Sequence, residues 1–283
     1  MMVIETTEKA REKKPLIEWI PISSMWLREI IRFLNMKTRV ISSFAEPFLF
    51  LTLLAIPFSR LMPPGSEGMM SQMFGSLSFF AFLAPGIVGI GLVSRGIMGG
   101  VTVIWDKEFG FLKEVMVAPV RRVSLMIGRS LGGMTIAIVQ ALVTIGVASL
   151  FGIWYGFQVH SAAGLGLALV FIILTFATFI GFGITLGALF EETEGFMSIV
   201  TLLQLPMFFL SGAFVPIGLL NGVPVLYQLQ FINPLTYGID GIRASLTGAS
   251  PFFPLWVDLV VLLAFTLIFL ILGARAFNRM QVS

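Results

Sequence analysis

Residues of the types that do chemistry are few in this chain, and their spacing matches no catalytic site. The single histidine, His160, excludes a multi-histidine metal site, and the lack of cysteine excludes thiolate chemistry. The motifs H-E-x-x-H and G-x-x-x-x-G-K-[ST] do not occur. Acidic residues inside apolar runs are Glu46 and Asp258, while Arg95 falls where it can snorkel to a membrane face. The sequence therefore predicts no enzyme activity and no cofactor bound by this chain.

The clearest grouping of polar residues is a charged stretch at 105–122, WDKEFGFLKEVMVAPVRR, between two long apolar runs. Phe109, Leu112 and Met116 fall at i, i+3 and i+7, which makes one apolar face of a helix that Pro119 ends. The charged side chains lie largely away from this face: Asp106, Lys107, Lys113 and Glu114. These residues alone leave two interpretations open. The stretch is either a solvated connection resting on lipid or a helix that docks in a groove of a partner.

The elements that must position these residues are membrane-spanning helices. Hydrophobic residues make up 57% of the 283 residues and charged residues only 12%, whereas soluble domains carry about 25% charge. Apolar runs long enough to cross a core of about 30 Å recur along the chain. The sequence thus predicts an all-α integral membrane protein with six spans, at about 41–62, 73–104, 123–151, 164–190, 195–214 and 255–277.

The distribution of positive charge predicts the orientation. Residues 1–40 contain eight Lys or Arg and residues 105–129 contain five, while the connections 63–72 and 152–163 contain none. Because positive charge concentrates on the cytoplasmic side, both termini and the charged stretch are predicted to be cytoplasmic. The predicted location is the cell membrane. The chain divides into a cytoplasmic N-terminal segment, 1–40, and a single six-span domain, 41–283.

The N-terminal segment contains an amphipathic pattern from about Pro21. One apolar stripe comprises Ile22, Trp26, Ile30 and Phe33, and a largely basic stripe comprises Arg28, Arg32, Asn35 and Arg39. A helix of this kind lies in the membrane interface with its cations toward anionic headgroups. The alternative is an extension of the first span.

The segment 214–243 is too interrupted by proline and glycine for a plain span and too apolar for a loop. Asn233 and Pro234 are typical of a helix start, as cap and first helical residue. Asp240 and Arg243, three residues apart, are predicted to pair on one face of that helix. Three glycine pairs at a spacing of four are interpreted as helix-packing contacts: Gly96/Gly100, Gly128/Gly132 and Gly183/Gly187.

Two groups of residues together resemble one family of membrane proteins. The charged stretch fits an acidic-x-Glu-x-Gly-x-Leu pattern followed by proline, at Asp106, Glu108, Gly110, Leu112 and Pro119. The late segment carries SGAFVPI (211–217) and NPLTYGIDGIR (233–243). With six spans and a basic amphipathic N-terminal helix, the chain resembles the permease subunit of type-2 ABC exporters from about residue 20 onward. It departs from the family pattern after the glycine, because Lys113 follows Leu112 and the acidic residue comes one position later, at Glu114.

The resemblance implies roles for these residues. The charged stretch would be a coupling helix that docks on a separate ATPase subunit, which binds the ATP and Mg. Its residues would be Asp106, Lys107, Glu108, Phe109, Gly110, Leu112, Glu114, Met116 and Pro119. A re-entrant helix pair would form a gate region with Gly212, Pro216, Asn233, Pro234, Tyr237, Asp240 and Arg243.

The expected partners are an ATPase subunit, a second permease chain in a homodimer, and membrane lipid, with no nucleic acid. The expected function is outward movement of an amphiphilic drug, lipid or lipid-linked glycan. Two alternatives stay open. The first alternative is a self-contained secondary transporter or channel, and the second is a structural protein that recruits a cytoplasmic partner.

Overall fold

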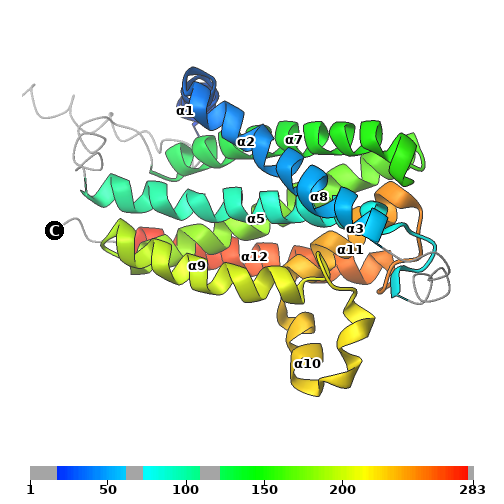
Figure 1. Cartoon of the computed structure of the whole chain (residues 1–283). Coiled ribbons are helices and arrows are strands. Elements are labelled where there is room, and N and C mark those ends of the chain that lie inside the picture. The colour runs from blue at the N-terminus through cyan, green and yellow to red at the C-terminus, as the bar shows by residue number, and fades with distance from the viewer. Residues whose placement is uncertain (1–17, 62–72, 109–121, 280–283) are drawn as a thin grey trace, which may run out of the picture.

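A computed structural model describes residues 18–61, 73–108 and 122–279, and its regular elements in these ranges are helices (Figure 1). Six of the described segments are long and apolar enough to cross a membrane. They are Lys37–Ser59, Phe79–Trp105, Ser124–Tyr155, Ala162–Leu189, Thr193–Leu210 and Leu255–Ala276. The predicted all-α, six-span architecture is therefore confirmed.

The N-terminal half of the first span is separated from the preceding helix by a break at Met36. Helix α1 (Trp19–Asn35) ends there, and α2 (Lys37–Leu49) begins at the next residue. The span continues through the π-helical segment η1 (Phe50–Ala55) into α3 (Ile56–Leu61). Arg39, predicted on the basic stripe of the interfacial helix, therefore lies on α2 and not on α1.

Helix α1 packs along the first half of α7 (Arg122–Tyr155). Ile22 and Phe33 are buried in this contact, and Trp26 Nε1 donates a hydrogen bond to Thr135 Oγ1 at 3.0 Å. Two residues of the predicted apolar stripe, Ile22 and Phe33, are thus buried against the rest of the chain, while Trp26 is partly exposed. Arg28 and Arg32 of α1 are exposed, as predicted for its basic face. The location of α1 at the membrane interface stays a prediction.

The centre of the molecule is the contact between α5 (Phe79–Glu108) and α8 (Ala162–Leu189). A Cβ on Gly100 would overlap the carbonyl oxygen of Gly183, and one on Gly187 would overlap that of Gly100. Only glycine therefore permits this backbone approach. The glycine pairs on α5 and α8 are confirmed as packing contacts. The pair on α7 faces α1 in the same way.

Two short helices precede the last span, α12 (Leu255–Arg279), and they differ in burial. After α9 (Thr193–Leu210) and the 3₁₀ turn η2 (Ile217–Gly222), α10 (Pro224–Ile232) stands away from the bundle (Figure 1). Helix α11 (Pro234–Thr247) is instead buried from Pro234 to Leu246, against α5, α8 and α12. The helix pair is present, and its re-entrant position in a membrane stays a prediction.

Candidate transport site

Arg243 on α11 holds together three parts of the chain that are distant in sequence. Its guanidinium Nη2 donates to the carbonyl oxygen of Gly212 at 2.6 Å, and its Nε donates to that of Phe82 at 3.2 Å. The guanidinium carbon also lies 3.9 Å from the centroid of the Phe82 ring. Gly212 has a φ of 77°, the left-handed conformation that ends helix α9 and that favours glycine. Arg243 therefore anchors the turn after α9 to α5 and α11.

Asp240 lies one turn before Arg243, but the two side chains form no ion pair in the part of the chain that the structure describes. The Asp240 Oδ2 atom accepts a hydrogen bond from the Phe253 backbone N–H at 2.9 Å, while Arg243 donates to carbonyls. The predicted pair is thus replaced by separate backbone contacts. Burial raises the pKa of Asp240, and burial lowers the pKa of Arg243 to about 10, so the guanidinium stays charged at neutral pH.

An open hollow of about 660 Å³ lies beside these two side chains. Asp240 and Arg243 line it together with Pro216, Phe74 and Phe252, so charged groups meet an apolar wall. The volume falls within the range of small-molecule sites, about 300–1,000 Å³. This hollow is the candidate site at this end of the bundle.

The other predicted gate residues build the elements around the hollow and do not line it. Asn233 caps α11, because its Oδ1 accepts from the Leu235 N–H at 3.0 Å, and its Nδ2 donates to the Met207 carbonyl at 2.8 Å. Pro234 occupies the first turn of the helix, so the predicted helix start is confirmed. The Tyr237 hydroxyl donates to the Phe231 carbonyl at 2.9 Å and fixes α10 against α11.

A polar cluster in the other half of the bundle was not predicted from the sequence. Pro47 lacks the N–H that would otherwise bond to the Ser43 carbonyl one turn earlier in α2. Gln140 of α7 supplies the missing donor, since its Nε2 donates to that carbonyl at 2.8 Å. The Oε1 atom of Gln140 accepts from Arg95 Nε, and Arg95 Nη2 donates to Ser43 Oγ at 2.7 Å. These bonds join α2, α5 and α7.

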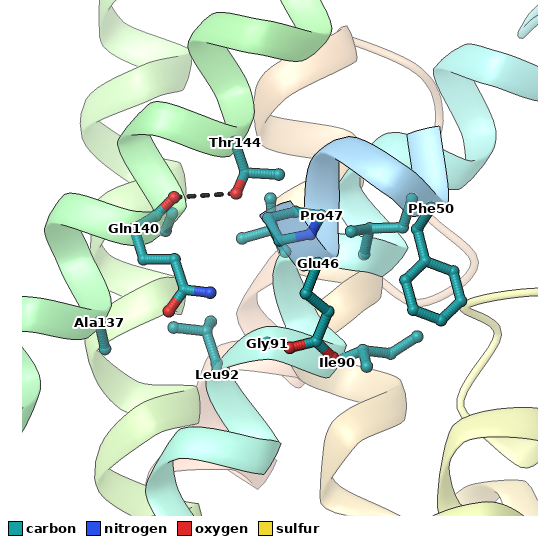
Figure 2. Close-up of a pocket in the computed structure, with 12 residues that line it drawn as sticks. Glu46, Pro47, Phe50, Ile90, Gly91, Leu92, Ala137, Gln140 and Thr144 are labelled. Carbon is teal, nitrogen blue, oxygen red and sulfur yellow. Dashed lines mark hydrogen bonds between the residues drawn. The ribbon is translucent and has the colours of Figure 1, made fainter. Parts of the chain in front are cut away.

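Arg95 is thus held by side chains of two other helices, where snorkelling was predicted. A small pocket adjoins the cluster between α2, α5 and α7 (Figure 2). Its free volume is about 20 Å³, which accommodates about one water molecule. Glu46 and Gln140 both line the pocket, and Glu46 is exposed on the surface of the single chain.

The predicted coupling residues fall at a boundary of the described structure. Asp106, Lys107 and Glu108 form the last helical residues of α5, and α7 begins at Arg122. The remaining residues lie outside the described ranges: Phe109, Gly110, Leu112, Glu114, Met116 and Pro119. The structure therefore places the two helices that flank the stretch, and the coupling helix itself stays a prediction.

Comparison with known proteins identifies the family. The family model described as "ABC-2 type transporter" matches residues 21–247, which include nearly all of α1, the first five spans and the α10–α11 pair. The chain belongs to the ABC-2 type transporter family. It is 26% identical over 252 residues to "Inner membrane transport permease YadH" of Escherichia coli (strain K12), covering 89% of this chain and 92% of that protein. It is also 24% identical over 182 residues to "Probable multidrug ABC transporter permease YbhR" of the same strain, covering 63% and 47%.

Membership of the ABC-2 family identifies the general role of the chain, its location and the class of its partner. The chain is a multi-pass membrane protein and a permease component of an ABC transporter, and the family implies an ATPase partner. Within this ABC-2 permease, the hollow at Arg243 and the polar cluster at Gln140 are two polar sites that the described structure builds.

Proposed function

We propose that this chain is the permease subunit of an ATP-driven exporter in which two copies form the path for an amphiphilic drug, lipid or lipid-linked glycan. A separate subunit binds ATP and Mg and hydrolyses the ATP. Two features of the chain support this proposal. One is a row of polar side chains on the least buried span, and the other is the open hollow of about 660 Å³ beside Arg243.

The uncovered span is α9, the least buried of the six. Ser198, Thr201 and Gln204 follow one another at a spacing of three on this helix, among exposed side chains such as Leu202 and Leu205. The Ser198 and Thr201 hydroxyls donate to carbonyl oxygens of their own helix, those of Glu194 at 3.0 Å and Met197 at 2.9 Å, so the Gln204 amide is the group that most favours a neighbouring helix. A second copy of the chain would cover this row and leave a partly polar path between the two α9 helices.

The charge distribution supports an orientation of the bundle in the membrane. Helix α1, the start of α7 and the C-terminal end of α12 lie at one end of the bundle (Figure 1). We assign this end to the cytoplasm because the Lys and Arg residues concentrate there. The hollow lined by Arg243 then opens on the outer side, where an exported molecule leaves.

Force from the ATPase would enter through the charged stretch, because residues 109–121 connect α5 directly to α7. Helix α5 is packed through its glycines against α8, so a displacement of its end is carried into the centre of the molecule. The apolar residues Phe109 and Leu112 would dock on the ATPase, with the charged residues forming a rim.

The test is purification of the tagged protein from its native membranes in mild detergent, scoring the ATPase that accompanies it. Wild type should bring an ATPase, and a Phe109→Asp, Leu112→Asp variant should lose it. A Val225→Asp, Leu226→Asp variant is the matched control, since these exposed residues lie on α10, which stands away from the bundle (Figure 1). If no ATPase accompanies wild type under conditions that preserve weak complexes, the proposal is wrong.

One observation favours a proton-driven secondary transporter as the second candidate. Both carboxylate oxygens of Asp258 in α12 are buried and have no hydrogen-bond partner in the described part of the chain. Such groups mark proton paths in membrane transporters. In that case Asp258→Asn abolishes gradient-driven flux, whereas an ATP-driven exporter retains its flux with this substitution.

A further inference from the structure

A second pocket lies at the α1 end of the bundle, among residues of α1, α2, α5, α7 and α8. Its free volume is about 80 Å³. One water molecule needs about 10–15 Å³ by the same measure, so the pocket has room for a group of several heavy atoms. A phosphate group is of this size.

The lining of this pocket combines positive charge with an apolar wall. Three arginines, Arg39, Arg95 and Arg129, line it against a single carboxylate, that of Glu29, so the lining is positively charged overall. The apolar wall includes Phe33, Met98, Ile136, Phe176 and Ile180. A net positive charge beside apolar side chains is suited to an amphiphilic anion.

Arg95 is the group that most needs an anion. It is half-buried, and its hydrogen-bond acceptors are neutral: the Gln140 side-chain oxygen and the Ser43 hydroxyl. The Phe33 ring, 5.3 Å from its guanidinium carbon, is neutral as well. Among the described residues, no carboxylate forms an ion pair with Arg95. A guanidinium has five N–H donors, and these two bonds use only two.

The depth of Arg95 makes an incompletely balanced charge costly: the nearby Glu46 carboxylate, which favours the charged guanidinium, is exposed, and Arg39 repels the guanidinium. A core of about 30 Å takes about twenty helical residues, so a core entered at Phe79 is left near Met98. Arg95 then lies three residues, about 4.5 Å, inside the hydrocarbon boundary, from where its long side chain can extend toward the lipid phosphates. Charged side chains at this depth are stable when they are paired. The nearest abundant anion outside the protein is a lipid headgroup.

We infer that this pocket binds the phosphate of an anionic phospholipid, held by Arg95 and Arg39, with the start of its acyl chain along the apolar wall. Arginine suits this role because its planar donors match phosphate oxygens two at a time. The exposed Arg32 of α1 adds to the general attraction of this face for anionic lipid without lining the pocket. The site stands independently of what the protein transports.

The test measures lipid binding by the purified full chain through its thermal unfolding in detergent. Dioleoyl phosphatidylglycerol is titrated in mixed micelles and compared with zwitterionic dioleoyl phosphatidylcholine. Arg95→Gln and Arg39→Gln should each weaken the apparent affinity for phosphatidylglycerol about tenfold, since a lost charge contact of about 1.4 kcal/mol is a factor of ten. Arg32→Gln is the matched control and should stay within about twofold of wild type. Arg39→Gln keeps the test decisive if Arg95→Gln fails to fold, because Arg39 is exposed.

Three results would overturn the inference. Equal stabilisation by the two lipids would exclude selection of an anionic headgroup. Equal loss of affinity in Arg39→Gln and Arg32→Gln would mean that surface charge and not the pocket attracts the lipid. A third arm adds inorganic phosphate alone, and stabilisation as large as that by phosphatidylglycerol would reassign the pocket to a soluble phosphate.

Discussion

The bond from Gln140 to the Ser43 carbonyl makes a sharp prediction, because it exists to replace the N–H that Pro47 lacks. Replacing Gln140 with leucine puts an apolar side chain of similar size at this position in α7. It leaves the Ser43 carbonyl without its donor at 2.8 Å, and Arg95 Nε without its acceptor. Gln140→Leu should therefore destabilise the protein, by an amount that depends on the residue at position 47.

The magnitude follows from the two bonds. A neutral hydrogen bond contributes about 0.5–1.5 kcal/mol to the free energy of unfolding, and one to a charged group about 1.5–3 kcal/mol. Gln140→Leu should then cost about 2–4.5 kcal/mol. Pro47→Ala restores a backbone N–H to the Ser43 carbonyl, so the Gln140→Leu cost in that background should fall by about 0.5–1.5 kcal/mol.

The assay is thermal unfolding in detergent of four proteins: wild type, each single variant and the double variant. At about 2 °C per kcal/mol, the coupling corresponds to about 1–3 °C in Tm. Gln228→Leu is the matched control, since Gln228 is exposed on α10 and its amide forms no hydrogen bond among the described residues. If the Gln140→Leu cost is the same with and without Pro47, the two positions are independent and the reasoning is refuted.

Three further perturbations test other contacts. Gly187→Leu should lower the free energy of unfolding by about 3 kcal/mol, because its side chain would overlap the Gly100 backbone, while Gly166→Leu, with open space around it, should change the Tm little. Arg243→Lys should lower the Tm by several degrees despite the conserved charge, since a lysine cannot reach two carbonyls and stack on Phe82 at once; an unchanged Tm would contradict the fork geometry. Asp258→Asn should change the free energy of unfolding by less than about 1 kcal/mol, because neither carboxyl oxygen of Asp258 has a hydrogen-bond partner among the described residues, and a clear loss of stability would mean that a group outside the single chain holds this carboxyl.

The spans could be predicted from the sequence because lipid leaves the backbone few options. An apolar run in hydrocarbon must satisfy its own hydrogen bonds, so the runs became helices near the predicted limits. Their ends were less predictable. The second span begins at Phe79 and not at Met73, because the chain turns at Gly75 with a φ of 65° inside the apolar run. Helix α1 ends before Met36, and the sequence has no proline or glycine at this point that would predict the break.

The spacing of residues along the sequence did not predict which groups the polar side chains bind. Asp240 and Arg243 stand three apart on one helix, which predicts a pair, yet Phe253 and Gly212 offer backbone groups that bind each one separately. Pro47 does predict that the Ser43 carbonyl requires a hydrogen-bond donor from elsewhere, since a proline in a helix leaves the carbonyl one turn earlier without its N–H partner. Its donor lies 97 positions away, a separation that no local pattern contains.

The different ways in which the spans are held suggest how force would pass through the molecule. In lipid the apolar effect between helices is weak, so close backbone packing and polar bonds decide which helices move together. Helix α5 is joined to α8 by glycine packing, and its other end gives the Phe82 carbonyl to Arg243. A push at Glu108 would thus reach the hollow along one helix of 30 residues, about 45 Å long. We therefore expect Arg243→Lys to impair transport while the ATPase stays bound, and Phe109→Asp, Leu112→Asp to release the ATPase while the hollow stays intact. Loss of ATPase binding in Arg243→Lys would contradict this division.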